Sequence, residues 1–116
     1  MKITESMQGT VAVIQLKGKM MGGPDMQELH DHVKGLLNDG VRHVVADLSK
    51  VKWLNSSGLG ALMGALTTIR NEGGDMKLAH ASDKIQRLLM ITKLMSIFDT
   101  HETVESAVKA FETVTE

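Results

Sequence analysis

The stretch of sequence that decides the fold is residues 47–60, which read Asp47-Leu48-Ser49-Lys50-Val51-Lys52-Trp53-Leu54-Asn55-Ser56-Ser57-Gly58-Leu59-Gly60. In it a buried strand ends, a short loop follows, and residues suited to capping open a helix after Asn55. The carboxyl ends of strands are where sites gather in open α/β sheets. This junction is therefore where we look first for function.

Asn55, Ser56 and Ser57 have two roles open to them. The structural role is to cap the helix, because their side chains can accept hydrogen bonds from backbone N–H groups that have no partner at a helix start. The functional role is modification, because a serine at the positive end of a helix dipole tolerates an added phosphate. The pattern alone leaves both interpretations open.

The rest of the chain alternates strands and helices around this junction. Two strands, Lys2–Met7 and Thr10–Leu16, are expected to form a hairpin turning at Gln8-Gly9, and 41–48 is apolar on consecutive positions, as in a strand buried on both faces. Helical spacing of apolar residues predicts helices over 24–39, 56–71 and 104–111, and a further helix that Ser82-Asp83 caps and that carries Ile85, Leu88 and Leu89. Two short strands are expected at Met76–Ala79 and Ile97–Phe98.

The order β-β-α-β-α-β-α-β-α predicts the α/β class, with a mixed central sheet of about five strands and right-handed crossovers. The 116 residues fit a single domain spanning 1–116, because one core is the usual solution at this size. A stripe of small residues runs along the helix after Asn55, and each helical glycine costs about 1 kcal/mol relative to alanine. The stripe therefore indicates a close approach, either of the sheet or a neighbouring helix, or of a partner's helix; it comprises Gly58, Gly60, Ala61, Gly64 and Ala65.

Composition excludes several classes of partner. The formal net charge is -1 and the chain has only three aromatic residues, Trp53, Phe98 and Phe111, so neither nucleic acid nor a membrane surface is an expected partner. Cysteine is absent, and no apolar run is long enough for a signal peptide or a membrane span. We expect a cytoplasmic protein.

Motifs for enzymes and cofactors fit poorly. Residues 58–64 have the spacing Gly-x-Gly-x-x-x-Gly, which differs from the dinucleotide-binding fingerprint, and 54–58 lacks the Gly-x-Ser-x-Gly of serine hydrolases. Gly18-Lys19 lacks the remainder of a P-loop. His30 and His32 cannot share a helix face at their spacing, so no metal site is expected. The sequence predicts neither a catalytic residue nor a cofactor.

Specific motifs give this chain a family resemblance. Asp47-Leu48-Ser49 followed by Asn55-Ser56-Ser57-Gly58-Leu59-Gly60 resembles the signature of the STAS family, which sulphate transporters and anti-sigma factor antagonists share and whose loop reads Asp-Ser-Ser-Gly-Leu-Gly. Residues 73–78, 85–89 and 92–98 also follow the family's pattern. The resemblance covers nearly the whole chain and implies a STAS domain of the free-standing antagonist type.

The resemblance implies a partner switch that regulates transcription. The unmodified antagonist would bind an anti-sigma factor that is also a serine kinase, and phosphorylation of Ser56 would end the complex. A phosphate carries about -1.5 to -2 charges, which disrupts a docked surface by repulsion and desolvation. The partner-binding residues implied are Met21, Gly22, Gly23, Asn55, Ser56, Ser57, Gly58 and Leu59, on a protein that is a monomer or weak dimer.

Two positions depart from the family pattern. The acid that usually precedes the phosphorylated serine is Asn55 here, and the family's Gly-Glu-Leu-Asp corresponds to Gly18-Lys19-Met20-Met21, which places Met21 where a second acid is usual. Both changes make the surroundings of Ser56 less acidic. An alternative is therefore a phosphorylation-independent interaction module, with the same docking face, in another signalling pathway.

Overall fold

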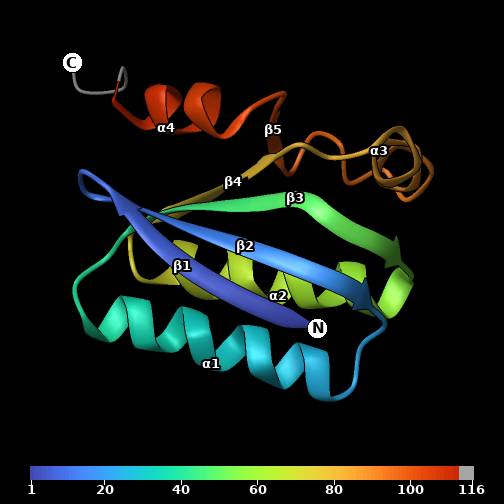
Figure 1. Ribbon diagram of the computed structural model, residues 1–116, viewed down its shortest axis with the longest axis horizontal. Helices are drawn as coiled ribbons and strands as arrows, with labels where there is room; N and C mark the ends of the chain where they lie inside the picture. The colour runs from blue at the N-terminus through green and yellow to red at the C-terminus, as the bar shows by residue number, and fades with distance from the viewer. Residues whose placement is uncertain (113–116) are drawn as a thin grey trace.

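The computed structural model describes residues 1–112, which form a five-stranded sheet and four helices (Figure 1). The element order matches the predicted β-β-α-β-α-β-α-β-α. The elements are β1 (Lys2–Gln8), β2 (Val11–Met20), α1 (Pro24–Asn38), β3 (His43–Leu54), α2 (Ser56–Asn71), β4 (Asp75–Ala79), α3 (Asp83–Ile91), β5 (Asp99–His101) and α4 (Val104–Glu112).

The strands lie side by side in the order β1-β2-β3-β4-β5. The first pair is an antiparallel hairpin whose turn includes Gly9 at φ +64, a conformation that glycine adopts without steric cost. Every other neighbouring pair is parallel, which confirms the predicted mixed sheet. The carboxyl ends of β2, β3, β4 and β5 therefore lie along one edge of the sheet.

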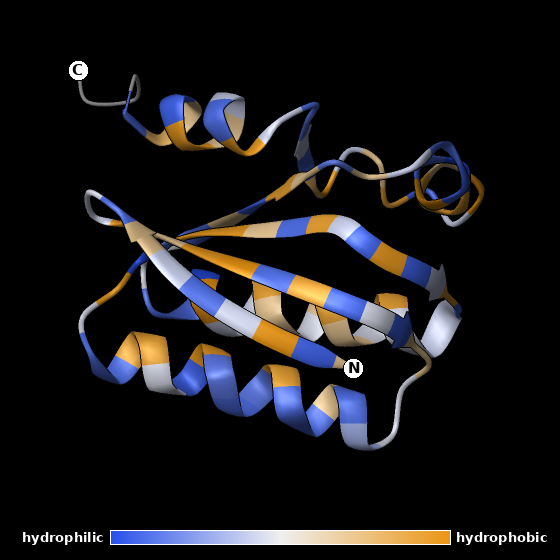
Figure 2. Ribbon diagram, viewed as in Figure 1, coloured by the Kyte–Doolittle hydropathy of each residue, from blue (hydrophilic) through white to orange (hydrophobic). Residues whose placement is uncertain are grey.

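Helices cover both faces of the sheet (Figure 1). The larger core lies between the sheet and α1 and α2, and Figure 2 shows that the apolar parts of α1 face the strands. The fully buried Ile14, Leu29, Leu62 and Leu78 belong to it, as do Ile85 and Leu89 of α3. A smaller core on the opposite face packs α4 against the sheet; it comprises Val11, Val13, Val45, Ala79, Ala107, Val108 and Phe111.

Two expected boundaries were wrong. The segment from Ser49 to Leu54 is not a loop, because β3 continues through it and pairs with β2 as far as Met20, with register shifts at Gln15/Lys17 and Gly18/Lys19. The last strand is Asp99–His101 instead of Ile97–Phe98. Phe98 is 3% exposed and packs into the larger core. It is therefore a core residue that precedes the strand and is not part of it.

The small-residue stripe of α2 divides into two faces. A Cβ on Gly58 would lie 2.0 Å from the carbonyl oxygen of Met20, so this glycine permits α2 to contact the backbone of β2. Ala61 and Ala65 are buried in the larger core. Gly60 and Gly64 are exposed, and a Cβ on either would have no described neighbour within 4 Å. The expected close approach within the fold is therefore confirmed at Gly58 only.

This division predicts opposite effects of the same substitution. Gly58→Ala should lower the free energy of unfolding by about 2–3 kcal/mol, because the added methyl group collides with a strand backbone. Gly64→Ala should raise it by up to about 1 kcal/mol, because alanine is the better helix former. Urea unfolding of both variants measures the two changes. Equal effects of the same sign would contradict the packing described for Gly58.

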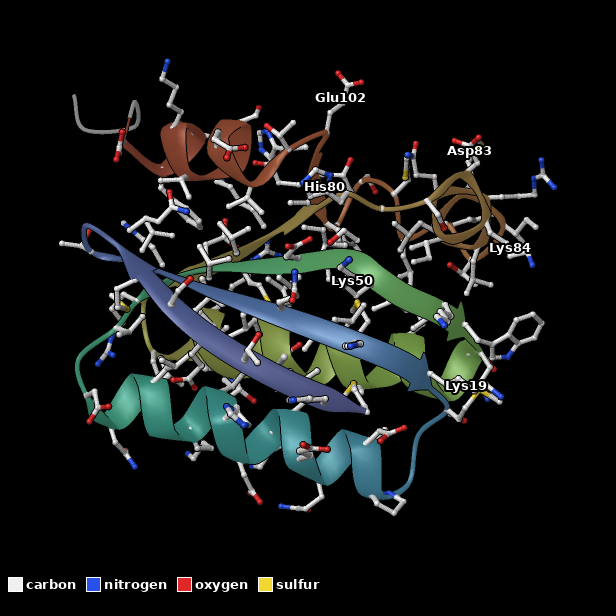
Figure 3. The ribbon with its side chains drawn as sticks, in the orientation of Figure 1. Lys19, Lys50, His80, Asp83, Lys84 and Glu102 are labelled. Atoms are coloured by element: carbon white, nitrogen blue, oxygen red, sulfur yellow. The ribbon has the colours of Figure 1, made fainter. Side chains whose placement is uncertain are left out.

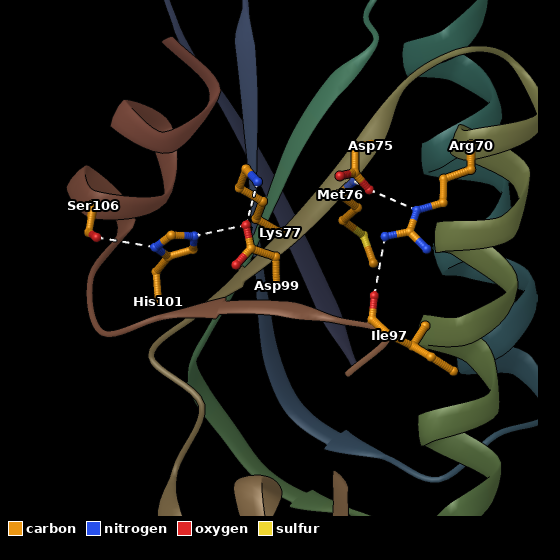
Figure 4. Close-up of polar contacts among 8 residues, drawn as sticks. All are labelled: Arg70, Asp75, Met76, Lys77, Ile97, Asp99, His101 and Ser106. Atoms are coloured by element: carbon orange, nitrogen blue, oxygen red, sulfur yellow. Dashed lines mark hydrogen bonds and ion pairs between the residues drawn. The ribbon is translucent and has the colours of Figure 1, made fainter. Parts of the chain in front are cut away.

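Polar contacts hold β5 and the segment before it (Figure 4). Arg70 Nε donates to Asp75 Oδ1 at 3.0 Å, and Arg70 Nη2 donates to the carbonyl oxygen of Ile97 at 3.2 Å. Asp99 Oδ2 accepts a hydrogen bond from Lys77 Nζ and lies 3.2 Å from His101 Nε2. The Lys77 side chain is 9% exposed, so Asp99 supplies the negative charge that its ammonium group needs.

These partners also change the titration of Asp99. Burial by itself would raise the pKa of the carboxyl group, but the hydrogen bonds and positive charges of Lys77 and His101 outweigh burial and lower that pKa below its ordinary value. A lowered pKa in the folded state means that the ionised carboxylate stabilises the fold above the pKa of the unfolded chain. That contribution is lost as pH falls through the folded-state pKa.

We therefore expect Asp99→Asn to destabilise the fold by about 1 kcal/mol at neutral pH, since the carboxylate is partly solvent-screened. The difference from the original protein should shrink on acidification below the folded-state pKa of Asp99, where both proteins lack the charge. Denaturant unfolding across pH measures it. Asp39→Asn, which removes an exposed carboxylate at the end of α1, is the control. A loss that did not vary with pH would contradict the ion-pair explanation.

Candidate functional site

The candidate site is built where β2 and β3 end together. Met20 and Leu54 are register partners in the last pair of the ladder, and the backbone N–H of Asn55 donates to the carbonyl oxygen of Met20 at 3.3 Å. Helix α2 begins at the next residue, Ser56. The continuation of β3 thus fixes the start of α2 against the sheet without an intervening loop.

Asn55 is the N-cap of α2, as the sequence predicts. Its side-chain Oδ1 accepts from the N–H of Gly58 at 2.8 Å, and its carbonyl oxygen accepts from the N–H of Leu59 at 2.9 Å. Its amide Nδ2 also donates to the carbonyl oxygen of Met21 at 3.5 Å. One side chain therefore joins the first turn of α2 to the segment that follows β2.

The segment Met21–Gly23 crosses close to the start of α2. Gly22 has φ +89, and a Cβ on it would lie 2.7 Å from the Cβ of Ser57, so only glycine lets the segment pass this closely. Met21 is 44% exposed. The segment then enters α1, whose N-cap is Gly23.

The predicted site residues lie in this one region, but they are not equally accessible. Met21, Gly23, Ser56 and Ser57 are exposed, and Asn55 is partly exposed. Gly22, Gly58 and Leu59 are buried, and the side chain of Leu59 belongs to the larger core. The partner-binding role of the eight residues stays a prediction; five of them are accessible to a partner, and the three buried ones pack beneath these five.

Asp25 is a residue of this region that the sequence did not single out. Its Oδ2 accepts from the N–H of Met21 at 3.4 Å, and its side chain is 20% exposed. It lies in the first turn of α1, where the positive end of the helix dipole stabilises an acidic side chain. An acid directly after Gly-Gly-Pro is the signal that would have found it. Its carboxylate thus contacts the backbone of Met21, the position at which the family pattern has an acid.

The electrostatics of the site favour an anion. The first turn of α2 contains no acidic residue, and the dipole of this 16-residue helix places partial positive charge at Ser56. Gly58, Gly60 and Gly64 all lie within the helix, so they do not form the tight loop of a dinucleotide site. Within residues 1–112 no group of three or more His, Cys, Asp or Glu side chains is placed to hold a metal ion.

Comparison with known proteins agrees with this geometry. The model of the STAS domain family matches residues 3–107. The chain belongs to the STAS domain family. In sequence, it is 30% identical over 78 residues to the anti-sigma-B factor antagonist of Staphylococcus aureus, an alignment that covers 67% of this chain and 72% of that protein.

Solved structures share the fold of this STAS chain. The phosphorylated form of the Bacillus cell fate determinant SpoIIAA superposes with a TM-score of 0.72 at 16% identity, over 95% of this chain and 99% of that one. A sulfate transporter family protein from Wolinella succinogenes superposes with a TM-score of 0.74 at 14% identity, over 93% and 89%. At these identities the likeness shows the fold alone. In residues 1–112 of this chain, no helix has the length and apolar character to span a membrane.

The cap geometry makes a prediction for this STAS domain. Asn55→Ala should destabilise it by about 1 kcal/mol, because the N–H of Gly58 loses its acceptor. Asn55→Asp keeps the acceptor and adds a favourable charge at the helix start but loses the Nδ2 donation to Met21, so it should be more stable than Asn55→Ala. Thermal and urea unfolding compare the three proteins. Equal losses in both variants would show that the acceptor for Gly58 contributes nothing and would assign the loss to the bond with Met21.

Proposed function

We propose that this chain is an anti-sigma factor antagonist that binds an anti-sigma factor and is released when Ser56 is phosphorylated. The surface that docks is formed by the exposed Met21, Gly23, Ser56 and Ser57 together with Asn55. The anti-sigma factor acts as the serine kinase: a phosphoryl group passes from a nucleoside triphosphate to Ser56 Oγ, and the nucleoside diphosphate leaves. The chain catalyses no reaction itself and acts in the cytoplasm.

The single observation that carries this proposal is the position of Ser56. Its side chain is exposed in the first turn of α2, where the helix dipole tolerates a phosphate, and the neighbouring Gly58 and Leu59 are buried. A modified Ser56 therefore changes the charge of the surface without disturbing the core. The curated relative from Staphylococcus aureus is named an anti-sigma-B factor antagonist, which supports the same role here.

The exposed face of α2 also supports protein docking. Gly60 and Gly64 lie on it without contacts inside the described fold, although each costs the helix about 1 kcal/mol relative to alanine. A partner that approaches the helix backbone closely accounts for glycine at both positions.

A second candidate is an interaction module that does not depend on phosphate. The neutral Asn55 and Met21 favour it, because both replace acids of the family pattern beside the serine. In that case Ser56 and Ser57 serve only the helix start, and docking occurs through the same surface in another signalling pathway.

Charge at Ser56 separates the two candidates. We expect Ser56→Asp to weaken binding to the anti-sigma factor by at least about tenfold, or about 1.4 kcal/mol, while Ser56→Ala binds as the original does. Isothermal titration calorimetry with anti-sigma factors from the native organism measures this. Ser6→Asp, an exposed serine on β1, controls for the added charge.

The modification itself is tested by the intact mass of the protein isolated from its native cells. A mass increase of one phosphate that phosphatase removes, and that Ser56→Ala abolishes, is the expected result. Equal affinities of the alanine and aspartate variants, with no such mass increase, would leave only the phosphate-independent module.

A further inference from the structure

A second exposed surface lies on the other side of the β3 end from α2. A groove with a volume of about 270 Å³ separates the last residues of β3 from α3. Its floor and walls are largely apolar, and it is lined by Val51, Lys52, Trp53, Leu54, Ser82, Lys84, Ile85, Arg87, Leu88 and Ile91. The docking surface around Ser56 does not include these side chains.

Large apolar side chains remain exposed at this groove. Trp53 is 47% exposed and Ile91 is 72% exposed. The side chains of Ile85 and Leu89 already fill the inner face of α3, so these outer residues contribute nothing to the core. Exposed apolar side chains gathered in this way mark a surface that another molecule covers.

The polar side chains of the groove carry one sign of charge. Lys52, Lys84 and Arg87 line it, and no acidic residue does. Lys84 Nζ lies 5.1 Å from the centre of the Trp53 ring, which places positive charge over the most polarizable part of the groove. Asp83 and Lys84 point to different sides of α3 in Figure 3, so the carboxylate of Asp83 does not neutralise this cluster.

We propose that this groove binds an acidic amphipathic helix of a partner protein, whose apolar face packs on Trp53 and Ile91 and whose carboxylates pair with Lys84 and Arg87. The nine residues of α3 make a wall about 13 Å long, which matches two to three turns of a bound helix with anchors at i, i+3 and i+4. A concave groove accepts side chains one at a time, so a helix fits it better than a flat bilayer does. This inference does not depend on the anti-sigma factor proposal.

The test uses Trp53, the single tryptophan of the chain, as the reporter. The probe is a synthetic helical peptide of about 15 residues with leucine on one face and glutamate on the other. Binding should shift the fluorescence of the full chain to shorter wavelength, because the half-exposed indole becomes buried. A scrambled peptide and one with lysine in place of glutamate should bind at least about tenfold more weakly.

Variants locate the binding. Ile91→Ser and Lys84→Glu/Arg87→Glu change exposed side chains and should each weaken the acidic peptide at least about tenfold, by lost apolar contact and by charge repulsion respectively. Met7→Ser on β1 and the double variant Lys2→Glu/Lys34→Glu make matched changes at exposed positions elsewhere and should leave the affinity unchanged. Far-ultraviolet circular dichroism confirms that each variant is folded.

Several results would overturn the inference. Equal binding of the three peptides, or affinities that the groove variants do not change, would remove the helix as occupant. A shift of Trp53 caused by decanoate or by phosphatidylglycerol vesicles, but not by the acidic peptide, would assign the groove to a small amphiphile or a membrane. Dimerisation abolished by Ile91→Ser would assign it to a second copy. The peptide assay contains no anti-sigma factor, so the groove proposal and the anti-sigma factor proposal can each fail without the other.

Discussion

The contact on which the site depends is the approach of α2 to the backbone of β2. Gly58 leaves room for the carbonyl oxygen of Met20, and that same oxygen accepts the N–H of Asn55. The first turn of α2 is therefore fixed to the sheet by its backbone, and Ser56 and Ser57 need no contacts of their own to be held in place. Buried residues thus do the positioning, while the side chains of Ser56 and Ser57 remain exposed.

Most of the fold was predictable because each helix presents a regular apolar face. Leu29 and Val33 of α1, or Leu62 and Leu66 of α2, face the sheet and recur at helical spacing, and they are all buried. The end of β3 was not predictable in this way. Lys50 and Lys52 interrupt the run of consecutive apolar residues, although their alternation with Val51 and Trp53 is the pattern of a half-exposed strand. No local pattern records the two register shifts in its pairing with β2. The position of β5 was also predicted wrongly. Phe98 is apolar because it packs into the core just before the strand, and the strand itself contains the polar Asp99 and His101.

The sequence predicted which residues make up the candidate site but not how exposed each of them is. Cap residues and glycines at a strand-to-helix junction indicated this region, and its role in partner binding stays a prediction. The helical spacing of Leu59 with Leu62 and Leu66 indicated that Leu59 faces the core, whereas no pattern in the sequence indicated how exposed Ser56 is. The groove could not be predicted from the sequence, because its residues are far apart in the chain. Trp53 comes from β3 and Ile91 from α3, and only the packing of the fold brings these segments together.

The two outer strands, β1 and β5, determine whether strands of other chains can add to the sheet. β5 has three residues, two of them Asp99 and His101, and β1 displays Lys2 and Glu5 along the opposite border. The shortness of β5 and the charged side chains along both borders discourage the addition of further strands, which is the common route to fibrous aggregation. The protein can thus expose apolar and hydroxyl-bearing patches at the end of its sheet while charge along its borders opposes non-specific growth.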